Sequence, residues 1–102
     1  VQGRIGDVIV TGGEKVWPTT VERALAELPW VVEAAVSGRP DPDWGHAVTA
    51  VVVIEPGEQA PSIDALREQL ADALPRYALP RALDVVESLP RTGVGKVERK
   101  SL

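Results

Sequence analysis

The sequence predicts an α+β fold in which a small mixed or antiparallel sheet is flanked by helices. Three observations lead to this prediction. Short runs of valine, isoleucine and alanine indicate strands, and two segments carry apolar residues at helical spacing. Proline or glycine lies at almost every junction between these segments. At 102 residues and without an internal repeat, the chain is expected to form one domain, over residues 1–102.

The first half of the chain predicts a strand, a helix and a second strand. Residues 7–10 are an apolar run that ends in a Thr-Gly-Gly turn. Pro18 suits the first turn of a helix, and Pro29 stops it. Residues 30–36 predict the second strand, and residues 38–43 predict the turn that closes it. The buried stripe of the helix falls at i, i+4 and i+7, on Val21, Leu25 and Leu28.

The second half predicts a strand, a helix and a final strand. Residues 47–54 are the most apolar and β-branched run, which predicts the central strand of the sheet. Ser62 can cap a second helix that runs to about Leu74, and Pro75 blocks its continuation. Residues 83–86 predict a short last strand. The predicted order is therefore strand, helix, two strands, helix, strand.

Composition excludes several classes of function. The absence of cysteine excludes disulfides, thiolate nucleophiles and cysteine-ligated zinc, and the single histidine, His46, is too little for a typical catalytic zinc site. A net charge of −4 argues against a general nucleic-acid surface. No apolar run reaches the roughly 20 residues that cross a bilayer, and nothing resembles a signal peptide. We expect a cytoplasmic protein with no membrane span, nucleic-acid partner or metal site.

A loop near the end of the sequence contains a candidate functional lysine, Lys96. Residues 89–100 are punctuated by proline and glycine, and such a loop would leave backbone groups unpaired inside a core, so Lys96 is expected to project outward. The Gly-Val-Gly-Lys run is not a P-loop, because Pro90 replaces the required first glycine and Val97 replaces the Ser or Thr. Taken alone, Lys96 is more readily interpreted as a solvated surface lysine than as a catalytic one.

The other candidate residues also have simple structural interpretations. Gly12 and Gly13 alone indicate a turn, although paired glycines let a ligand approach the backbone closely. Asp41 and Asp43, each preceded by proline, are interpreted as turn formers and not as a carboxylate pair. His46 is interpreted as a surface or structural residue. The three tryptophans are predicted to pack half-buried at the ends of elements, each with an indole N–H that needs a hydrogen-bond partner. They are Trp17, Trp30 and Trp44.

Together, these motifs resemble the C-terminal domain of acyl-adenylate-forming enzymes, the family of acyl-CoA synthetases, peptide-synthetase adenylation domains and luciferases. Residues 3–18, Gly-Arg-Ile-Gly-Asp-Val-Ile-Val-Thr-Gly-Gly-Glu-Lys-Val-Trp-Pro, resemble the start of that domain. Residues 33–45 resemble its middle segment, and residues 77–81 and 89–99 resemble its closing motifs. Within the family, Arg91 and the Thr-Gly-Gly-Glu turn are more similar to CoA ligases. The finer pattern is most similar to 2-succinylbenzoate–CoA ligases of menaquinone synthesis, or to aryl- and fatty-acyl-CoA ligases.

The resemblance implies roles for individual residues. Lys96 matches the catalytic lysine, which contacts the substrate carboxylate and ATP oxygens during adenylation and stabilises the negative charge that develops there. Arg4 matches an arginine near the nucleotide ribose, and Lys15 stands where some CoA ligases carry a basic residue near phosphate. Gly12 and Gly13 match the loop that lies beside the pantetheine arm of CoA after the domain rotates.

The sequence departs from the family pattern at the hinge. That position is usually aspartate or lysine, whereas here it is Gly6, followed by Asp7. Glycine still permits a large change in φ and ψ, so rotation is retained but its pivot is open between the two residues. Thr20 and His46 each stand where glutamate is common, and neither belongs to the implied chemistry.

The implied protein is the mobile C-terminal lid of an ATP-dependent acyl- or aryl-CoA ligase. Such an acid–thiol ligase uses ATP, Mg²⁺ and CoA to convert a small carboxylic acid to acyl-AMP and then to acyl-CoA. The chain opens at Val1 without methionine, so we expect it to be a piece of a longer protein. The resemblance implies a larger N-terminal domain as its partner and near inactivity of this domain in isolation. Two alternatives stay open: an adenylation domain that delivers to a carrier protein, and a non-catalytic interaction domain of similar scaffold.

The role implied for Lys96 gives a prediction for the full-length enzyme. The substitution Lys96→Ala removes the ammonium, so it should lower acyl-AMP formation by several orders of magnitude while sparing thioester formation from preformed acyl-AMP. Separate assays of the two half-reactions check this. Equal losses in both half-reactions would contradict the assigned role.

Overall fold

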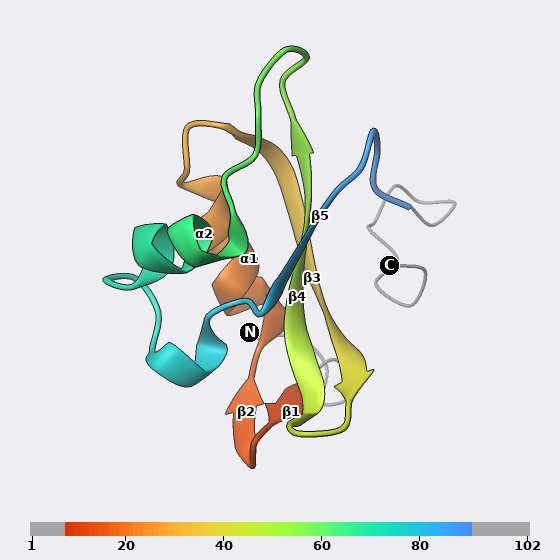
Figure 1. Ribbon diagram of the computed structural model, residues 1–102, viewed down its shortest axis with the longest axis vertical. Helices are drawn as coiled ribbons and strands as arrows, with labels where there is room; N and C mark the ends of the chain where they lie inside the picture. The colour runs from red at the N-terminus through yellow and green to blue at the C-terminus, as the bar shows by residue number, and fades with distance from the viewer. Residues whose placement is uncertain (1–7, 91–102) are drawn as a thin grey trace.

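Figure 1 shows the computed structural model, which describes residues 8–90. This part of the chain forms a five-stranded sheet, two α helices and one short 3-10 helix, which confirms the predicted α+β class. The elements are β1 (Ile9–Thr11), β2 (Glu14–Val16), α1 (Pro18–Ala26), β3 (Val31–Asp41), β4 (Gly45–Ile54), α2 (Ile63–Leu70), η2 (Arg76–Ala78) and β5 (Ala82–Val85).

Strand β4 is the centre of the sheet, as the sequence predicts. β3 occupies one edge of β4. The two strands pair antiparallel from the Asp41–Gly45 pair to the Val31–Ile54 pair. The other edge of β4 pairs antiparallel with β1 at Gly45 and parallel with β5 further along. The sheet is therefore mixed, and residues 47–52 of β4 are all buried.

The two faces of the sheet are covered differently. Both helices lie on one face, where their apolar stripes meet side chains of β3 and β4 (Figure 1). The opposite face carries a smaller cluster of Ala35, Val51 and Leu89, and an ion pair joins Arg39 of β3 to Asp84 of β5 across β4. Alternation of side chains along each strand assigns neighbouring residues to the two faces. The main core includes Val21, Leu25, Val36, Val48, Ala50, Leu66 and Leu70.

The start of α2 is as predicted, but its end is earlier. The Ser62 hydroxyl accepts a hydrogen bond from the Ala65 N–H at 3.2 Å, so Ser62 is the N-cap. The α helix ends at Leu70, not near Leu74, because the N–H groups of Ala71 and Ala73 donate to carbonyls only three residues back, those of Glu68 and Leu70. Leu74 is nevertheless buried, which explains why the apolar spacing continued past the helix.

The turn predicted over residues 38–43 is wrong in extent. β3 continues to Asp41, and the turn itself is residues 42–44. Asp41 forms this turn as predicted, because its Oδ1 accepts hydrogen bonds from the N–H groups of Asp43 at 2.8 Å and Trp44 at 3.0 Å. The Asp41 carboxylate is therefore committed to the turn, which agrees with the interpretation of Asp41 as a turn former.

The outer edge of β3 is tied to α1. The Val36 N–H donates to the Glu22 carboxylate at 2.8 Å, which joins the helix to the strand. Because backbone N–H groups alternate between the two edges of a strand, Pro40 also turns its nitrogen to this outer edge. Pro40 consequently pairs with His46 without losing a bond to β4, and this is why a proline is tolerated inside a strand.

A three-residue strand, β2, was not predicted. It pairs antiparallel with β1 and begins directly after the Thr-Gly-Gly turn, in a stretch to which the sequence assigned no element. Two of its three residues are exposed, so it carries no apolar run that could have revealed it. Among residues 8–90, neither helix has the length or apolar character that crossing a membrane requires.

Candidate functional site

The candidate site is built around the turn between β1 and β2. Thr11 pairs with Glu14, so the loop consists of Gly12 and Gly13 alone. Their φ angles are +56° and +86°, both in the left-handed region. Two residues of positive φ define the type I′ turn that matches the twist of a two-residue hairpin. The backbone therefore favours glycine at both positions, ahead of asparagine, before any ligand is considered.

The two glycines face different surroundings. A Cβ added to Gly12 would lie 2.6 Å from Cε3 and 2.8 Å from Cζ3 of the Trp44 indole. A Cβ added to Gly13 would meet nothing within 4 Å. The missing side chain of Gly12 thus makes room for a tryptophan of the same chain, whereas the missing side chain of Gly13 leaves open space outside the protein.

Trp44 connects this turn to two other strands. Its carbonyl accepts the Gly12 N–H at 2.9 Å, and the next residue, Gly45, pairs with Thr11. The guanidinium carbon of Arg81 lies 3.7 Å from the centroid of the Trp44 ring, which is a cation–π contact. We call the exposed set of Gly12, Gly13, Trp44 and Arg81 the glycine-turn surface. It joins an aromatic ring, a cation and an accessible stretch of backbone.

Sequence reasoning missed the functional potential of Trp44 and Arg81. Trp44 was predicted to be half-buried, and it is 39% exposed, but no role was assigned to Arg81. Both residues belong to motifs that carry the family resemblance, the Trp-Gly pair and the Tyr-Ala-Leu-Pro-Arg segment. No sequence pattern predicts that these two residues are in contact, because the contact depends on how β5 packs beside β4. The predicted indole partner is found for Trp30, whose Nε1 donates to Gln69 at 2.9 Å.

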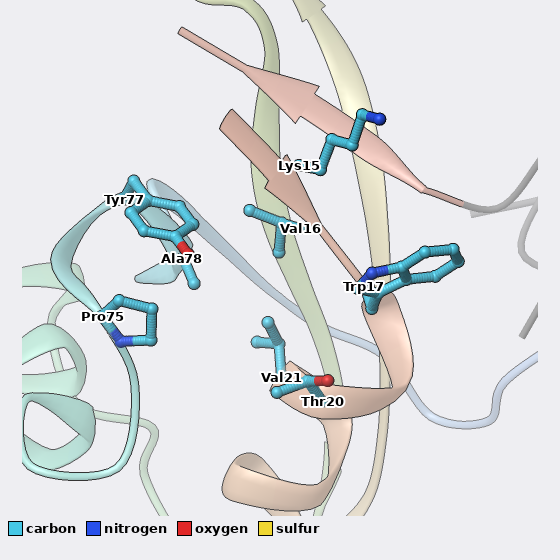
Figure 2. Close-up of a pocket in the computed structure, with 8 residues that line it drawn as sticks. All are labelled: Lys15, Val16, Trp17, Thr20, Val21, Pro75, Tyr77 and Ala78. Atoms are coloured by element: carbon cyan, nitrogen blue, oxygen red, sulfur yellow. The ribbon is translucent and has the colours of Figure 1, made fainter. Parts of the chain in front are cut away.

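Lys15 lies on β2, opposite Val10 of β1, and is exposed. It stands at the rim of a hollow between β2, the start of α1 and η2, and its ammonium points away from the ring of Tyr77 (Figure 2). The hollow has a volume of about 110 Å³, well below the roughly 300–1,000 Å³ of small-molecule sites. It cannot enclose a nucleotide, so a phosphate role for Lys15 requires a second surface opposite to it.

Four residues of the predicted site lie outside the described residues. These are Arg4, Gly6, Asp7 and Lys96, and their implied roles stay predictions. The structure brings together Gly12 and Gly13 and places Lys15 on the adjoining strand. Across residues 8–90, no group of His, Asp and Glu side chains is arranged to hold a metal ion.

Comparison with known proteins explains why these motifs occur together. Residues 20–96 match the model of the AMP-binding enzyme C-terminal domain. The chain belongs to this family. A salicylyl-CoA synthase / salicylate adenylyltransferase of a Streptomyces species is 46% identical to the chain over 103 residues, which cover 100% of the chain and 18% of that protein. The family resemblance inferred from the sequence is thereby confirmed.

Further relatives of this AMP-binding C-terminal domain are also CoA ligases. A probable 2-succinylbenzoate–CoA ligase of Mycobacterium tuberculosis is 44% identical over 102 residues, with 100% of the chain and 27% of that protein covered. The solved structure of a fatty acyl CoA synthetase of Mycobacterium tuberculosis superposes with a TM-score of 0.89 at 34% identity, covering 98% of the chain and 20% of that structure. The chain therefore spans between 18% and 27% of the length of these relatives.

The contact between Gly12 and Trp44 predicts a non-additive pair of substitutions. Gly12→Ala should lower the free energy of unfolding by about 3 kcal/mol, because it adds strain at positive φ and a clash with the indole. In a Trp44→Ala background the clash is absent, so the same substitution should cost only about 1–2 kcal/mol. Urea unfolding of the four chains of this cycle measures the difference. Additive costs would show that the indole does not restrict Gly12.

Proposed function

We propose that this chain is the mobile C-terminal domain of an ATP-dependent acyl- or aryl-CoA ligase, and that its glycine-turn surface faces CoA during thioester formation. The observation that carries the proposal is the open, left-handed turn at Gly13, which offers backbone with no side chain above it. The membership of the family and the CoA-ligase names of the relatives support the same function.

The proposed cycle has two half-reactions. In the first, the carboxylate of an aryl or fatty acid attacks the α-phosphate of ATP, acyl-AMP forms and pyrophosphate leaves, with Lys96 beside the developing charge. A bound Mg²⁺ would offset part of the negative charge of the phosphates. In the second, the thiol sulfur of CoA bonds to the acyl carbon, the bond from that carbon to the AMP oxygen breaks, and the thiol proton is released. Rotation at Gly6 or Asp7 exchanges the faces presented to the larger N-terminal domain.

The glycine-turn surface has the chemistry that CoA needs. The pantetheine arm is a thin, amide-bearing chain, and a turn without side chains lets such a chain lie close to the backbone. CoA also carries several phosphates, and Arg81 supplies an exposed cation next to the turn. Lys15 adds a second cation on the adjoining strand. We accordingly place adenylation with Lys96 and thioester formation with Gly13, in a cytoplasmic enzyme.

A side chain at Gly13 should affect one half-reaction selectively. Asparagine tolerates positive φ, so Gly13→Asn adds bulk on the open side without unfolding the turn. In the full-length ligase, we expect thioester formation from preformed acyl-AMP to fall by about tenfold or more, equivalent to about 1.4 kcal/mol, with adenylation unchanged.

Gly57 provides the matched control for this experiment. Its φ is +88°, against +86° for Gly13, and a Cβ there also meets nothing within 4 Å, but it lies in the turn after β4. Gly57→Asn therefore has the same backbone cost without touching the glycine-turn surface, and it should leave both half-reactions intact. Identical effects of the two substitutions would contradict the proposed role of Gly13.

The nature of the acyl acceptor is tested directly. Purified full-length enzyme, charged with acyl-AMP, should transfer the acyl group to free CoA faster than to a phosphopantetheinyl carrier protein. The measurement is acyl transfer to each acceptor at equal concentration. Preferred transfer to the carrier protein would replace the CoA-ligase assignment with that of an adenylation domain. A separate assay of pyrophosphate release over a panel of carboxylic acids would identify the acid substrate.

A further inference from the structure

Arg67 of α2 makes contacts that a surface residue of a helix would not need. Its Nη1 donates to the carbonyl of Pro80 at 2.9 Å and to the carbonyl of Leu79 at 3.3 Å. Residues 79–80 lie between η2 and β5, outside any helix or strand. Leu79 and Pro80 are both buried, and buried carbonyls need hydrogen-bond partners. A single guanidinium group therefore holds the two peptide units directly before Arg81.

The backbone of Arg81 is held from the other side as well. Its N–H donates to the carbonyl of Val48 on β4 at 2.8 Å. The start of β5 is thus clamped between a side chain of α2 and the central strand. From this fixed backbone the Arg81 side chain reaches over the ring of Trp44, which in turn packs on Gly12. A continuous set of contacts connects Arg67 to the glycine-turn surface.

We propose that Arg67 is a positioning residue that fixes Arg81 over Trp44 and so keeps the glycine-turn surface organised for CoA. The inference rests on the function proposed above, in which Arg81 faces the phosphates of CoA. Arg67 itself is half-buried and its contacts are directed at backbone carbonyls, so it acts on the ligand only through Arg81. An exposed, long side chain such as Arg81 can sample many rotamers, and a fixed backbone reduces the cost of holding it in one arrangement.

The test uses the full-length ligase with the substitution Arg67→Gln. We expect the KM for CoA in the thioester half-reaction to rise about tenfold, the size expected for loss of hydrogen bonds from a charged donor. The rate of acyl-AMP formation should be unchanged. Arg67→Lys should recover part of the loss, because a lysine keeps the charge but lacks the planar fork of donors.

Gln69 gives a matched control on the same helix. Its side chain accepts the exposed hydrogen bond from Trp30, so Gln69→Ala loosens α2 without touching residues 79–80. This variant should keep the KM for CoA of the parent enzyme. Proton NMR of the 102-residue chain adds a structural measurement. The ring-current shifts that Trp44 imposes on the Arg81 side chain should shrink in Arg67→Gln and persist in Gln69→Ala.

The outcomes separate this inference from the function on which it rests. If Arg81→Gln leaves the KM for CoA unchanged, the proposed CoA surface is wrong, and the binding role of Arg67 is overturned with it. If Arg81→Gln raises the KM but Arg67→Gln raises it no more than Gln69→Ala, the surface stands and Arg67 is not its positioning residue. Equal losses in both half-reactions for Arg67→Gln would reduce Arg67 to a general stabilising role.

Discussion

The candidate site depends on the pairing of β4 with strands on both of its edges. β3 occupies one edge, while β1 and β5 share the other, so their ends converge near the start of β4. The site residues follow from that convergence. Trp44 comes directly before β4, Thr11 at the end of β1 pairs with Gly45, and the Arg81 N–H bonds to Val48. Loss of the pairing with β1 would separate the turn from the ring, and loss of the pairing with β5 would separate the guanidinium group from the ring.

The sequence was a good guide wherever an element has its own local signal. The run of residues 47–54 predicted the central strand, and Ser62 predicted a cap, because β-branched runs and capping hydroxyls act locally. Prediction from the sequence failed where contacts between distant segments determine the local structure. Pro40 suggested a turn but lies in β3, since its nitrogen faces away from β4. The contact of Arg81 with Trp44 had no local signal at all.

Gly12 and Gly13 illustrate a limit of motif interpretation. In sequence they are equivalent, and the resemblance assigns both to the pantetheine arm. In the structure both serve the backbone of a type I′ turn, but Gly12 also accommodates Trp44, whereas Gly13 faces open space. A motif position can therefore be glycine for a reason internal to the fold. The functional proposal consequently rests on Gly13 more than on Gly12, and the distinction came only from a side-chain contact that the sequence does not encode locally.

The outer edge of β3 affects how this domain meets other chains. Exposed strand edges attract further strands, and the resulting continuous sheets are hard to separate. Along this edge one donor, the Val36 N–H, is already bound to Glu22, and Pro40 offers no donor. Strand addition there would lack two of its hydrogen bonds, which protects against aggregation. It also favours contacts through side chains and turns, which are released more readily than a continuous sheet.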